Sequence, residues 1–92
     1  MTSHTTEQFR KLFTELPKEI HKQAKEAYTH FKKDHYHPGL HFKRVHSTRS
    51  IYSARISKDY RVVGIQQNSK IIWFWVGSHS DYEKILKKLR QA

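Results

Sequence analysis

The sequence contains no cysteine, and this absence limits both how the chain can be stabilised and what it can bind. Without cysteine, neither disulfide bonds nor a zinc site with thiolate ligands can form. The absence is typical of a protein that works in a reducing compartment, and we expect a cytoplasmic location. Long apolar runs are also missing. No segment approaches the roughly 18 residues of a membrane-spanning helix, and Met1–Thr6 lacks a signal-peptide core, so we expect no membrane association.

Acidic residues are scarce. Only eight Asp and Glu stand against 18 Lys and Arg, which gives a formal net charge of +10 on 92 residues. So strong a positive charge indicates a polyanionic partner, and nucleic acid is the first candidate. Two alternatives are compatible with the same charge: it aids solubility alone, or an acidic protein partner neutralises it.

Apolar residues are few as well, at 36% of the chain, so a single modest core is expected. The one pronounced apolar run is Ile71–Val76, which Gly77-Ser78-His79 follows. Its β-branched and aromatic residues predict a central strand buried on both faces, after a hairpin turn at Asn68-Ser69. Trp73 and Trp75 are assigned to one face of this strand, in the core rather than stacked on bases. His79 would then be held rigidly at the exit of the strand.

The segments around this strand predict helices before the sheet and one helix after it. Apolar residues at helical spacing run from Phe9 to Leu16 and from Ile20 to Phe31, with Pro17 between the two helices. Alternating patterns predict strands over residues 40–46, 51–56 and 60–66. In the last helix Ser80 and Asp81 are candidate caps, and Ser80 with Glu83 matches a capping box. We predict a single α+β domain over residues 1–92, in which an N-terminal helical hairpin packs on a roughly four-stranded antiparallel sheet and a C-terminal helix follows.

Strand alternation groups several chemically competent side chains at one end of the predicted sheet. Arg55 points away from the apolar face of its strand, Arg61 opens the next strand, and His79 leaves the central one, with Asp59 in a turn. RNA cleavage without a metal requires a proton acceptor for the 2′-OH, a proton donor for the 5′-oxygen and positive charge on the phosphorane. Histidine can be either acid or base, and arginine binds phosphate. The alternative is that these side chains are only solvated or paired at strand ends.

Tyr82 and the remaining histidines have simpler explanations. Tyr82 lies on the apolar stripe of the last helix, so we expect its ring in the core and its hydroxyl exposed towards His79. His35, His37 and His41 are clustered, but they flank a Pro-Gly turn, and no carboxylate or thiolate joins them at ligand spacing. We therefore expect neither a metal nor a small-molecule cofactor.

Taken together, these motifs resemble the RelE/ParE superfamily of bacterial toxins from type II toxin–antitoxin pairs. The resemblance covers most of the chain and is carried by Leu16-Pro17, His37-Pro-Gly-Leu40, Tyr52-Ser-Ala-Arg-Ile56, Asp59-Tyr-Arg-Val-Val63 and Gly77-Ser-His-Ser-Asp81. The last motif resembles the strand exit of YafQ-type members that cleave messenger RNA, where its histidine is catalytic. The resemblance therefore implies a general acid or base role for His79, a phosphate-binding role for Arg61, and an acidic turn residue in Asp59.

The chain departs from that family at two places. Arg55 stands where the YafQ branch carries a histidine, so one half of an acid–base pair is unassigned, and His46 or Lys43 is the candidate to replace it. The strand that usually precedes the first helix in the family has only a weak counterpart, because Met1–Thr6 is short and polar.

The resemblance implies a ribosome-associated endoribonuclease toxin that cuts messenger RNA by metal-independent transesterification, with an acidic antitoxin as its protein partner. The expected catalytic residues are His79, Arg61, Arg55 and Tyr82, and the expected RNA contacts are Lys43, Arg44, His46, Lys58 and Asp59. Two other classes remain open: a ParE-like inhibitor of DNA gyrase that catalyses nothing, and a basic RNA-binding module without activity.

Overall fold

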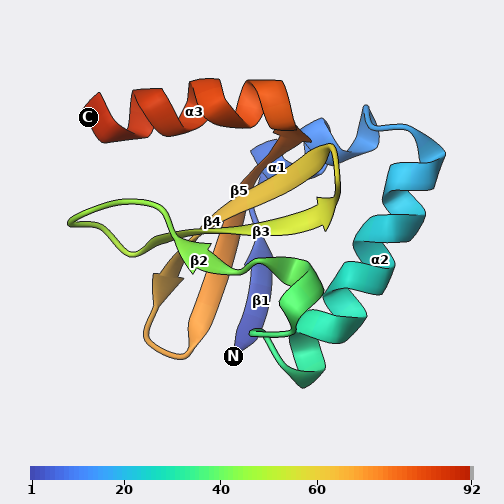
Figure 1. Cartoon of the computed structure of the whole chain (residues 1–92), viewed down its shortest axis with the longest axis horizontal. Helices are drawn as coiled ribbons and strands as arrows, with labels where there is room; N and C mark the ends of the chain where they lie inside the picture. Colours follow the sequence, from blue (N-terminus) through green and yellow to red (C-terminus); the bar gives the residue numbers. More distant parts are fainter. Residues whose placement is uncertain (92) are drawn as a thin grey trace.

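The computed structural model describes residues 1–91, in which helices cover both faces of one five-stranded sheet (Figure 1). The strands are β1 (Thr2–Thr5), β2 (Lys43–Arg44), β3 (Ile51–Ser57), β4 (Tyr60–Gln67) and β5 (Lys70–Ser78). The helices are α1 (Glu7–Thr14), α2 (Lys18–Lys33) and α3 (His79–Gln91), and a short 3-10 helix, η1, spans Pro38–Leu40. Within residues 1–91, no helix combines the length and the apolar character that crossing a membrane requires.

The sheet is mixed, with strand order β1-β5-β4-β3-β2, and it has one strand more than the predicted four. β2 to β5 form the expected antiparallel meander, whereas β1 pairs in parallel with β5, placing Ser3 opposite Ile71. The sequence prediction missed β1 because its residues, Thr-Ser-His-Thr, show no apolar alternation. Backbone hydrogen bonds hold this edge strand instead, such as that from Thr2 N–H to the Ser69 carbonyl at 3.1 Å.

β5 is the central strand that the apolar run predicted. It lies between β1 and β4, and Ile71 and Val76 are 0% and 2% exposed. β4 pairs with this strand from Lys70 to Ser78, and β1 covers its other edge from Lys70 to Trp73. The prediction of a buried spine is therefore confirmed.

A β-bulge at Phe74 decides which face of the sheet each tryptophan occupies. Val63 pairs with Trp75 and Gly64 with Trp73, so Phe74 is an extra residue between the two pairs. As a result Trp73 packs in the cluster beneath α2, whereas Trp75 packs against the cluster beneath α3. The prediction that the tryptophans share one face is wrong, because the extra residue reverses the alternation along the strand.

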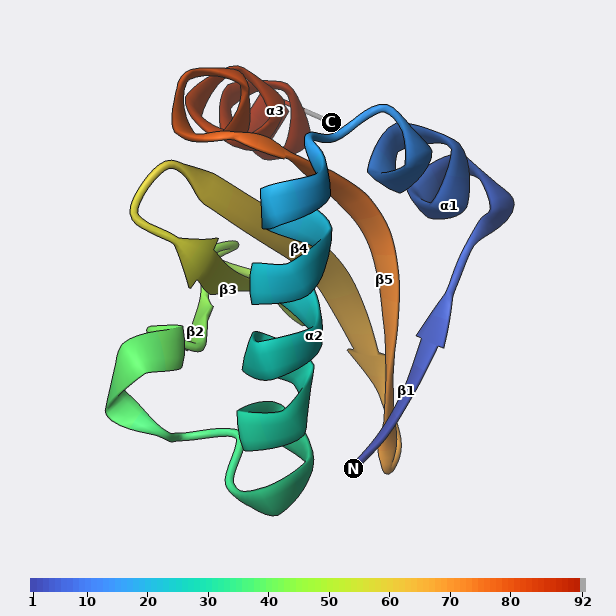
Figure 2. The same cartoon turned by 90° about the vertical axis from the view of Figure 1, so that its right-hand side faces the viewer.

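Two apolar clusters fix the helices to the sheet. The α2-side cluster contains Phe31, Leu40, Phe42, Ala54, Ile71 and Trp73. The α3-side cluster contains Ile51, Val63, Tyr82 and Leu86. In Figure 2, α2 runs along the sheet in front of the strands, and α3 is seen nearly end-on, away from α2. The molecule therefore presents two separate sheet faces, each with its own helical cover.

The caps of the helices fix where the chain turns from sheet to helix. Thr6 Oγ1 accepts a hydrogen bond from Phe9 N–H at 3.1 Å and so caps α1. α3 begins two residues earlier than a cap at Ser80 predicts: Ser78 Oγ, not Ser80 or Asp81, accepts the hydrogen bond from a first-turn N–H, that of Asp81, at 3.2 Å. His79 therefore lies in the first turn of α3 rather than in a loop before it.

Gly64 allows β4 and β5 to approach each other beside the bulge. A Cβ at this position would lie 2.8 Å from the Ile72 carbonyl oxygen and 2.8 Å from Cε3 of Trp73. Because a paired backbone cannot move away easily, we expect Gly64→Ala to lower the free energy of unfolding by about 2 kcal/mol in chemical denaturation. Gly39→Ala is the matched control, since its Cβ would meet only the His37 imidazole, at 3.5 Å. Equal stability of the two variants would contradict the close approach.

Candidate functional site

His79 lies where β5 passes into α3, and its backbone is fixed from two sides. Its N–H donates to the Asp59 carbonyl in the β3–β4 turn at 2.7 Å, and the Ser78 hydroxyl caps the helix that it begins. The His79 side chain nevertheless remains 53% exposed. A fixed backbone with an accessible imidazole is what a general acid or base requires.

Glu83 is a site residue whose proximity to His79 the sequence interpretation missed. His79 Nε2 lies 3.7 Å from Glu83 Oε1, one helical turn further along α3. The i,i+4 spacing was the signal that could have found it, but Glu83 was assigned to a capping box instead. Both side chains are more than half exposed, so the pair adds little to stability. The pair places a carboxylate beside the imidazole.

The two predicted phosphate-binding arginines lie directly opposite each other, Arg55 on β3 and Arg61 on β4. Arg61 Nη1 donates to the carbonyl oxygens of Ser57, Lys58 and Tyr60 at 2.8, 3.2 and 3.1 Å, so this guanidinium holds the β3–β4 turn in shape. These hydrogen bonds use one of its three nitrogens. Neither arginine forms an ion pair with a carboxylate among residues 1–91.

The bulge brings Arg61 and the exit of β5 onto the same face of the sheet. Gly77 pairs with Arg61, and two positions along β4 Val63 packs into the α3-side cluster. Directly paired residues share a face, so Arg61 and Gly77 both belong to the α3 side, as does the strand exit towards His79. Asp59, which is exposed in the adjoining turn, joins them through its carbonyl. The structure therefore gathers three of the predicted residues at one end of the sheet: His79, Arg61 and Asp59.

Tyr82 is placed differently from the prediction for its hydroxyl. Its hydroxyl donates to Ser53 Oγ at 2.9 Å inside the core, and the two residues are 5% and 2% exposed. The ring centroid lies 5.9 Å from that of His79. Tyr82 thus fixes α3 against β3 and packs beside the imidazole, while its hydroxyl is turned away from solvent.

A groove of about 590 Å³ runs between β2 and α3. Its lining combines residues of β2 and the following loop with residues of α3: Lys43, Arg44, Val45, His46, Ser47, Tyr82, Glu83, Leu86 and Arg90. Glu83 borders the groove and also lies beside the His79 imidazole, so it connects the two. Three permanent cations against one carboxylate suit a polyanionic ligand. We call this surface the β2–α3 groove.

His46 and Arg44 shape this groove. His46 Nδ1 accepts hydrogen bonds from Thr48 N–H and Arg49 N–H at 3.2 and 3.0 Å, so its Nε2 carries the proton and donates to the Leu89 carbonyl at 3.2 Å. Arg44 Nε donates to the carbonyls of His46 and Arg49 at 3.0 and 3.2 Å. With both ring nitrogens engaged, His46 is a structural residue here. Lys43 and Lys58 are exposed, on β2 and in the β3–β4 turn.

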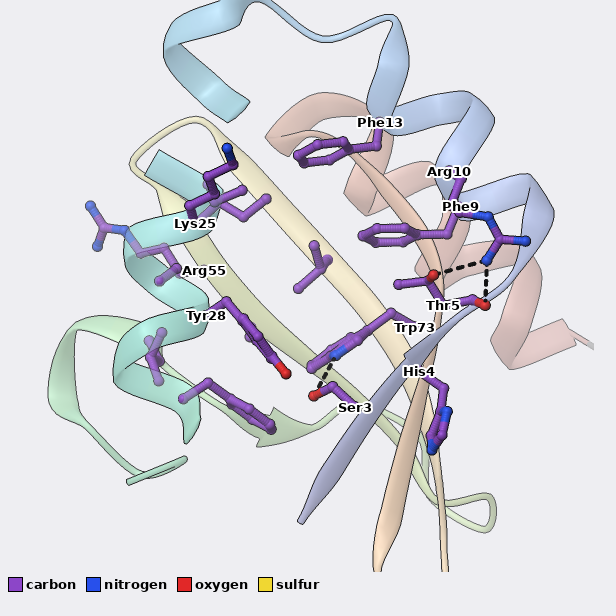
Figure 3. Close-up of a pocket in the computed structure, with 17 residues that line it drawn as sticks. Ser3, His4, Thr5, Phe9, Arg10, Phe13, Lys25, Tyr28, Arg55 and Trp73 are labelled. Carbon is purple, nitrogen blue, oxygen red and sulfur yellow. Dashed lines mark hydrogen bonds between the residues drawn. The ribbon is translucent and has the colours of Figure 1, made fainter. Parts of the chain in front are cut away.

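A second groove, of about 580 Å³, lies on the α2 side of the sheet (Figure 3). Its lining is mainly apolar and includes Phe9, Phe13, Tyr28 and Trp73, while Arg10, Lys25 and Arg55 add positive charge. Arg10 Nη1 is held by hydrogen bonds to Thr5 O and Oγ1 at 2.8 and 3.0 Å. Figure 3 shows the Arg55 stem at the border of this groove and its guanidinium directed away from it. We call this surface the α2-side groove.

The histidines do not assemble a metal site. Within residues 1–91, no group of three or more His, Asp or Glu side chains is arranged to hold a metal ion. His37 of the clustered set instead caps η1, its Nδ1 accepting from Gly39 N–H at 3.3 Å.

The architecture is a helical hairpin and a C-terminal helix around a mixed sheet, with a histidine at the exit of the central strand. Residues 18–84 match the family model of the ParE-like toxin domain. The chain belongs to this family, within the RelE/ParE superfamily of toxins.

Solved structures show the same fold at low sequence identity. A chain of the RelB–RelE antitoxin–toxin complex from Methanococcus jannaschii aligns with TM-score 0.72 and 17% identity, covering 89% of this chain and 96% of that one. YafQ from Escherichia coli aligns with TM-score 0.67 and 13% identity, over 87% and 94% of the two chains. A chain of the RelE–RelB complex from Pyrococcus horikoshii aligns with TM-score 0.66 and 18% identity, covering 84% of this chain and 92% of that one. Comparison with curated protein sequences gives no significant match.

The hydrogen bond between Tyr82 and Ser53 links α3 to the sheet below the candidate site. Removing the Tyr82 hydroxyl leaves the buried Ser53 hydroxyl without its donor, so we expect Tyr82→Phe to lower the free energy of unfolding by about 1 kcal/mol. In the Tyr82→Phe background, Ser53→Ala should cost less than it does in the unmodified chain. A double-mutant cycle in chemical denaturation measures this coupling, and a coupling energy of zero would contradict the bond.

Proposed function

We propose that this toxin domain is an endoribonuclease that cleaves messenger RNA on the ribosome without a metal, as one half of a type II toxin–antitoxin pair. The observation that carries the proposal is the accessible His79 imidazole, 3.7 Å from Glu83, which itself lines a groove together with Lys43, Arg44 and Arg90. A protein that only occupies a binding site on its target needs no oriented acid–base group at that position.

The proposed reaction is a transesterification within the RNA chain. The 2′-oxygen attacks the adjacent phosphorus, the bond to the 5′-oxygen breaks, and the products end in a 2′,3′-cyclic phosphate and a 5′-hydroxyl. One group must take the proton of the 2′-OH and another must give a proton to the departing oxygen. His79 fills one of these roles. Two residues that line the groove, Glu83 beside it and Lys43 on β2, are the candidates for the other.

Arg61 and Arg55 supply positive charge for the phosphorane. Their backbones are paired across β3 and β4, and neither is neutralised by an ion pair within residues 1–91. Arg61 keeps two of its nitrogens for phosphate oxygens while the third holds the turn. Cations that are fixed before the reaction stabilise developing charge without reorganisation.

Replacing His79 by Ala tests the catalytic assignment. Because general acid–base catalysis contributes about 10²- to 10⁴-fold, we expect messenger RNA cleavage to fall by at least about 100-fold. New RNA 5′ ends in a reconstituted translation system measure the rate. Thermal unfolding and RNA affinity serve as controls, and both should be unchanged since the side chain is exposed. Full activity in the variant would eliminate the assignment.

A second function, inhibition of DNA gyrase without catalysis, is favoured by one observation: the matched family model is that of ParE-like toxins. It predicts loss of supercoiling with translation unaffected, and a His79→Ala variant as inhibitory as the original chain. A supercoiling assay beside the translation assay therefore separates the two functions. Salt-dependent RNA binding with no new ends and no gyrase inhibition would instead leave a basic RNA-binding module.

We also propose that an acidic antitoxin docks in the α2-side groove. The M. jannaschii relative is part of an antitoxin–toxin complex. An amphipathic helix fits such a groove, because Phe9, Phe13 and Trp73 can receive its apolar face, while Lys25 and Arg10 can pair with its carboxylates. The net charge of +10 favours a partner of negative charge.

Charge reversal tests this docking site. We expect Lys25→Glu to weaken binding of the cognate acidic antitoxin by about tenfold, through repulsion at the groove. Lys87→Glu is the matched control, because Lys87 is exposed on α3, across the sheet. Isothermal titration calorimetry measures both affinities. If the two variants lose affinity equally, overall charge and not the groove governs the association.

A further inference from the structure

An exposed aromatic surface lies where α2 ends and η1 begins. Tyr36 is 67% exposed, against 44% and 42% for the other exposed large apolar residues, Tyr28 and Met1. Its ring centroid lies 4.3 Å from that of His35, and the next residue, His37, stacks on His30 with centroids 4.3 Å apart and an interplanar angle of 21°. We call His30, His35, Tyr36 and His37 the aromatic corner.

The aromatic corner is held in place although it faces solvent. Asp34 Oδ1 accepts a hydrogen bond from Tyr36 N–H at 3.0 Å, and the Asp34 carbonyl accepts one from His37 N–H at 2.9 Å. Below the corner, His35 lies 5.6 Å and Tyr36 5.9 Å from the ring of Phe42, which belongs to the α2-side cluster. The rings are therefore preorganised, and a ligand that stacks on them orders little that is not already ordered.

Folding does not account for this arrangement. An exposed tyrosine contributes little burial, and the turn is already closed by its backbone hydrogen bonds and by buried Leu40 and Phe42. The surrounding charge is positive: residues 30–44 contain four exposed cations, Lys32, Lys33, Lys43 and Arg44, and one carboxylate, Asp34. Rigid aromatic faces among cations are the chemistry that binds unpaired nucleotides.

We infer that the aromatic corner is a second RNA-contact surface, on which unpaired bases stack against Tyr36 and His37 while Lys32 and Lys33 contact phosphates. The tautomer of His37 suits this role: its Nδ1 accepts from Gly39 N–H at 3.3 Å, so a neutral ring presents a π face and an Nε2–H donor. Lys43 and Arg44 follow the corner in the chain and also line the β2–α3 groove, so one strand of RNA can contact both surfaces.

An acidic protein is the less suitable ligand for this surface. Its carboxylates would pair with the lysines, but its apolar side chains need a concave apolar site. That site is the α2-side groove, not the aromatic corner. None of the four residues of the aromatic corner lines that groove. Stacking on exposed rings, by contrast, needs flat π systems, which nucleobases supply in every sequence.

The inference rests on the proposed function for the identity of RNA as ligand, and binding measured apart from cleavage tests it. In a His79→Ala background, fluorescence anisotropy would follow a labelled single-stranded RNA and the same backbone with abasic sites. We expect Tyr36→Ala to weaken binding of the normal RNA by about tenfold and binding of the abasic RNA hardly at all. Tyr36→Phe, which keeps the ring, should retain the affinity.

Salt dependence separates stacking from phosphate contacts. Lys33→Ala should reduce the slope of log affinity against log salt by about one for both RNAs, whereas Tyr36→Ala should leave the slope unchanged. Unchanged affinity of Tyr36→Ala for normal RNA, or an equal loss for both RNAs, would overturn the inference. RNA cleavage by the unmodified chain tests the proposed endoribonuclease activity separately, so the activity and the RNA contact at the aromatic corner can be rejected independently of each other. Thermal unfolding of each variant excludes misfolding as the cause.

Discussion

The extra residue at Phe74 in β5 is the constraint on which the rest of the arrangement depends. Before the bulge, Ile71 and Trp73 face α2; after it, Trp75 and Gly77 face α3. An uninterrupted strand would keep all four on one face, since strand side chains alternate with a period of two. The exit towards His79 would then lie on the α2 side. The bulge thus places the imidazole on the face that Arg61 shares and that the basic groove borders.

Two glycines leave space for the indole rings that lie on opposite faces of the sheet before and after the bulge. Gly64 lies beneath Trp73, and Gly77 lies beneath Trp75, where a Cβ would be 2.6 Å from Cζ2 of that ring. Each indole therefore packs against bare backbone, one on either side of the sheet. Large aromatic surfaces are buried close to the strands in this way, which compensates for the small apolar content of the chain. The same packing restricts the end of β5. Because His79 follows β5 directly, this restriction also fixes the position of His79.

The parts of the fold that depend on side-chain pattern could be predicted from the sequence, and those that depend on backbone or long-range contacts could not. Apolar periodicity gave the three helices, the antiparallel meander and the buried run of β5. β1 was not predicted because main-chain hydrogen bonds hold this polar edge strand and do not depend on its side chains. The bulge was not predicted because nothing in Trp-Phe-Trp distinguishes strict alternation from one extra residue.

In the site, His79, Arg61 and Asp59 lie at one end of the sheet, as the topology suggested. The buried hydrogen bond of Tyr82 and the fixed ring of His46 depend on Ser53 and Leu89, which are far away in sequence.

The two faces of the sheet are not independent, because Arg55 belongs to both. Its stem borders the α2-side groove, and its backbone pairs with Arg61 on the candidate catalytic face. An acidic helix in the α2-side groove would lie beside the aliphatic part of the Arg55 side chain, whose guanidinium points away from the groove and has no ion pair within residues 1–91. A carboxylate that pairs with Arg55 removes positive charge from the site where, in the proposed reaction, the phosphorane forms. A partner could then inhibit cleavage without covering His79. Arg55 would in that case link binding of the partner to the chemistry at the other face.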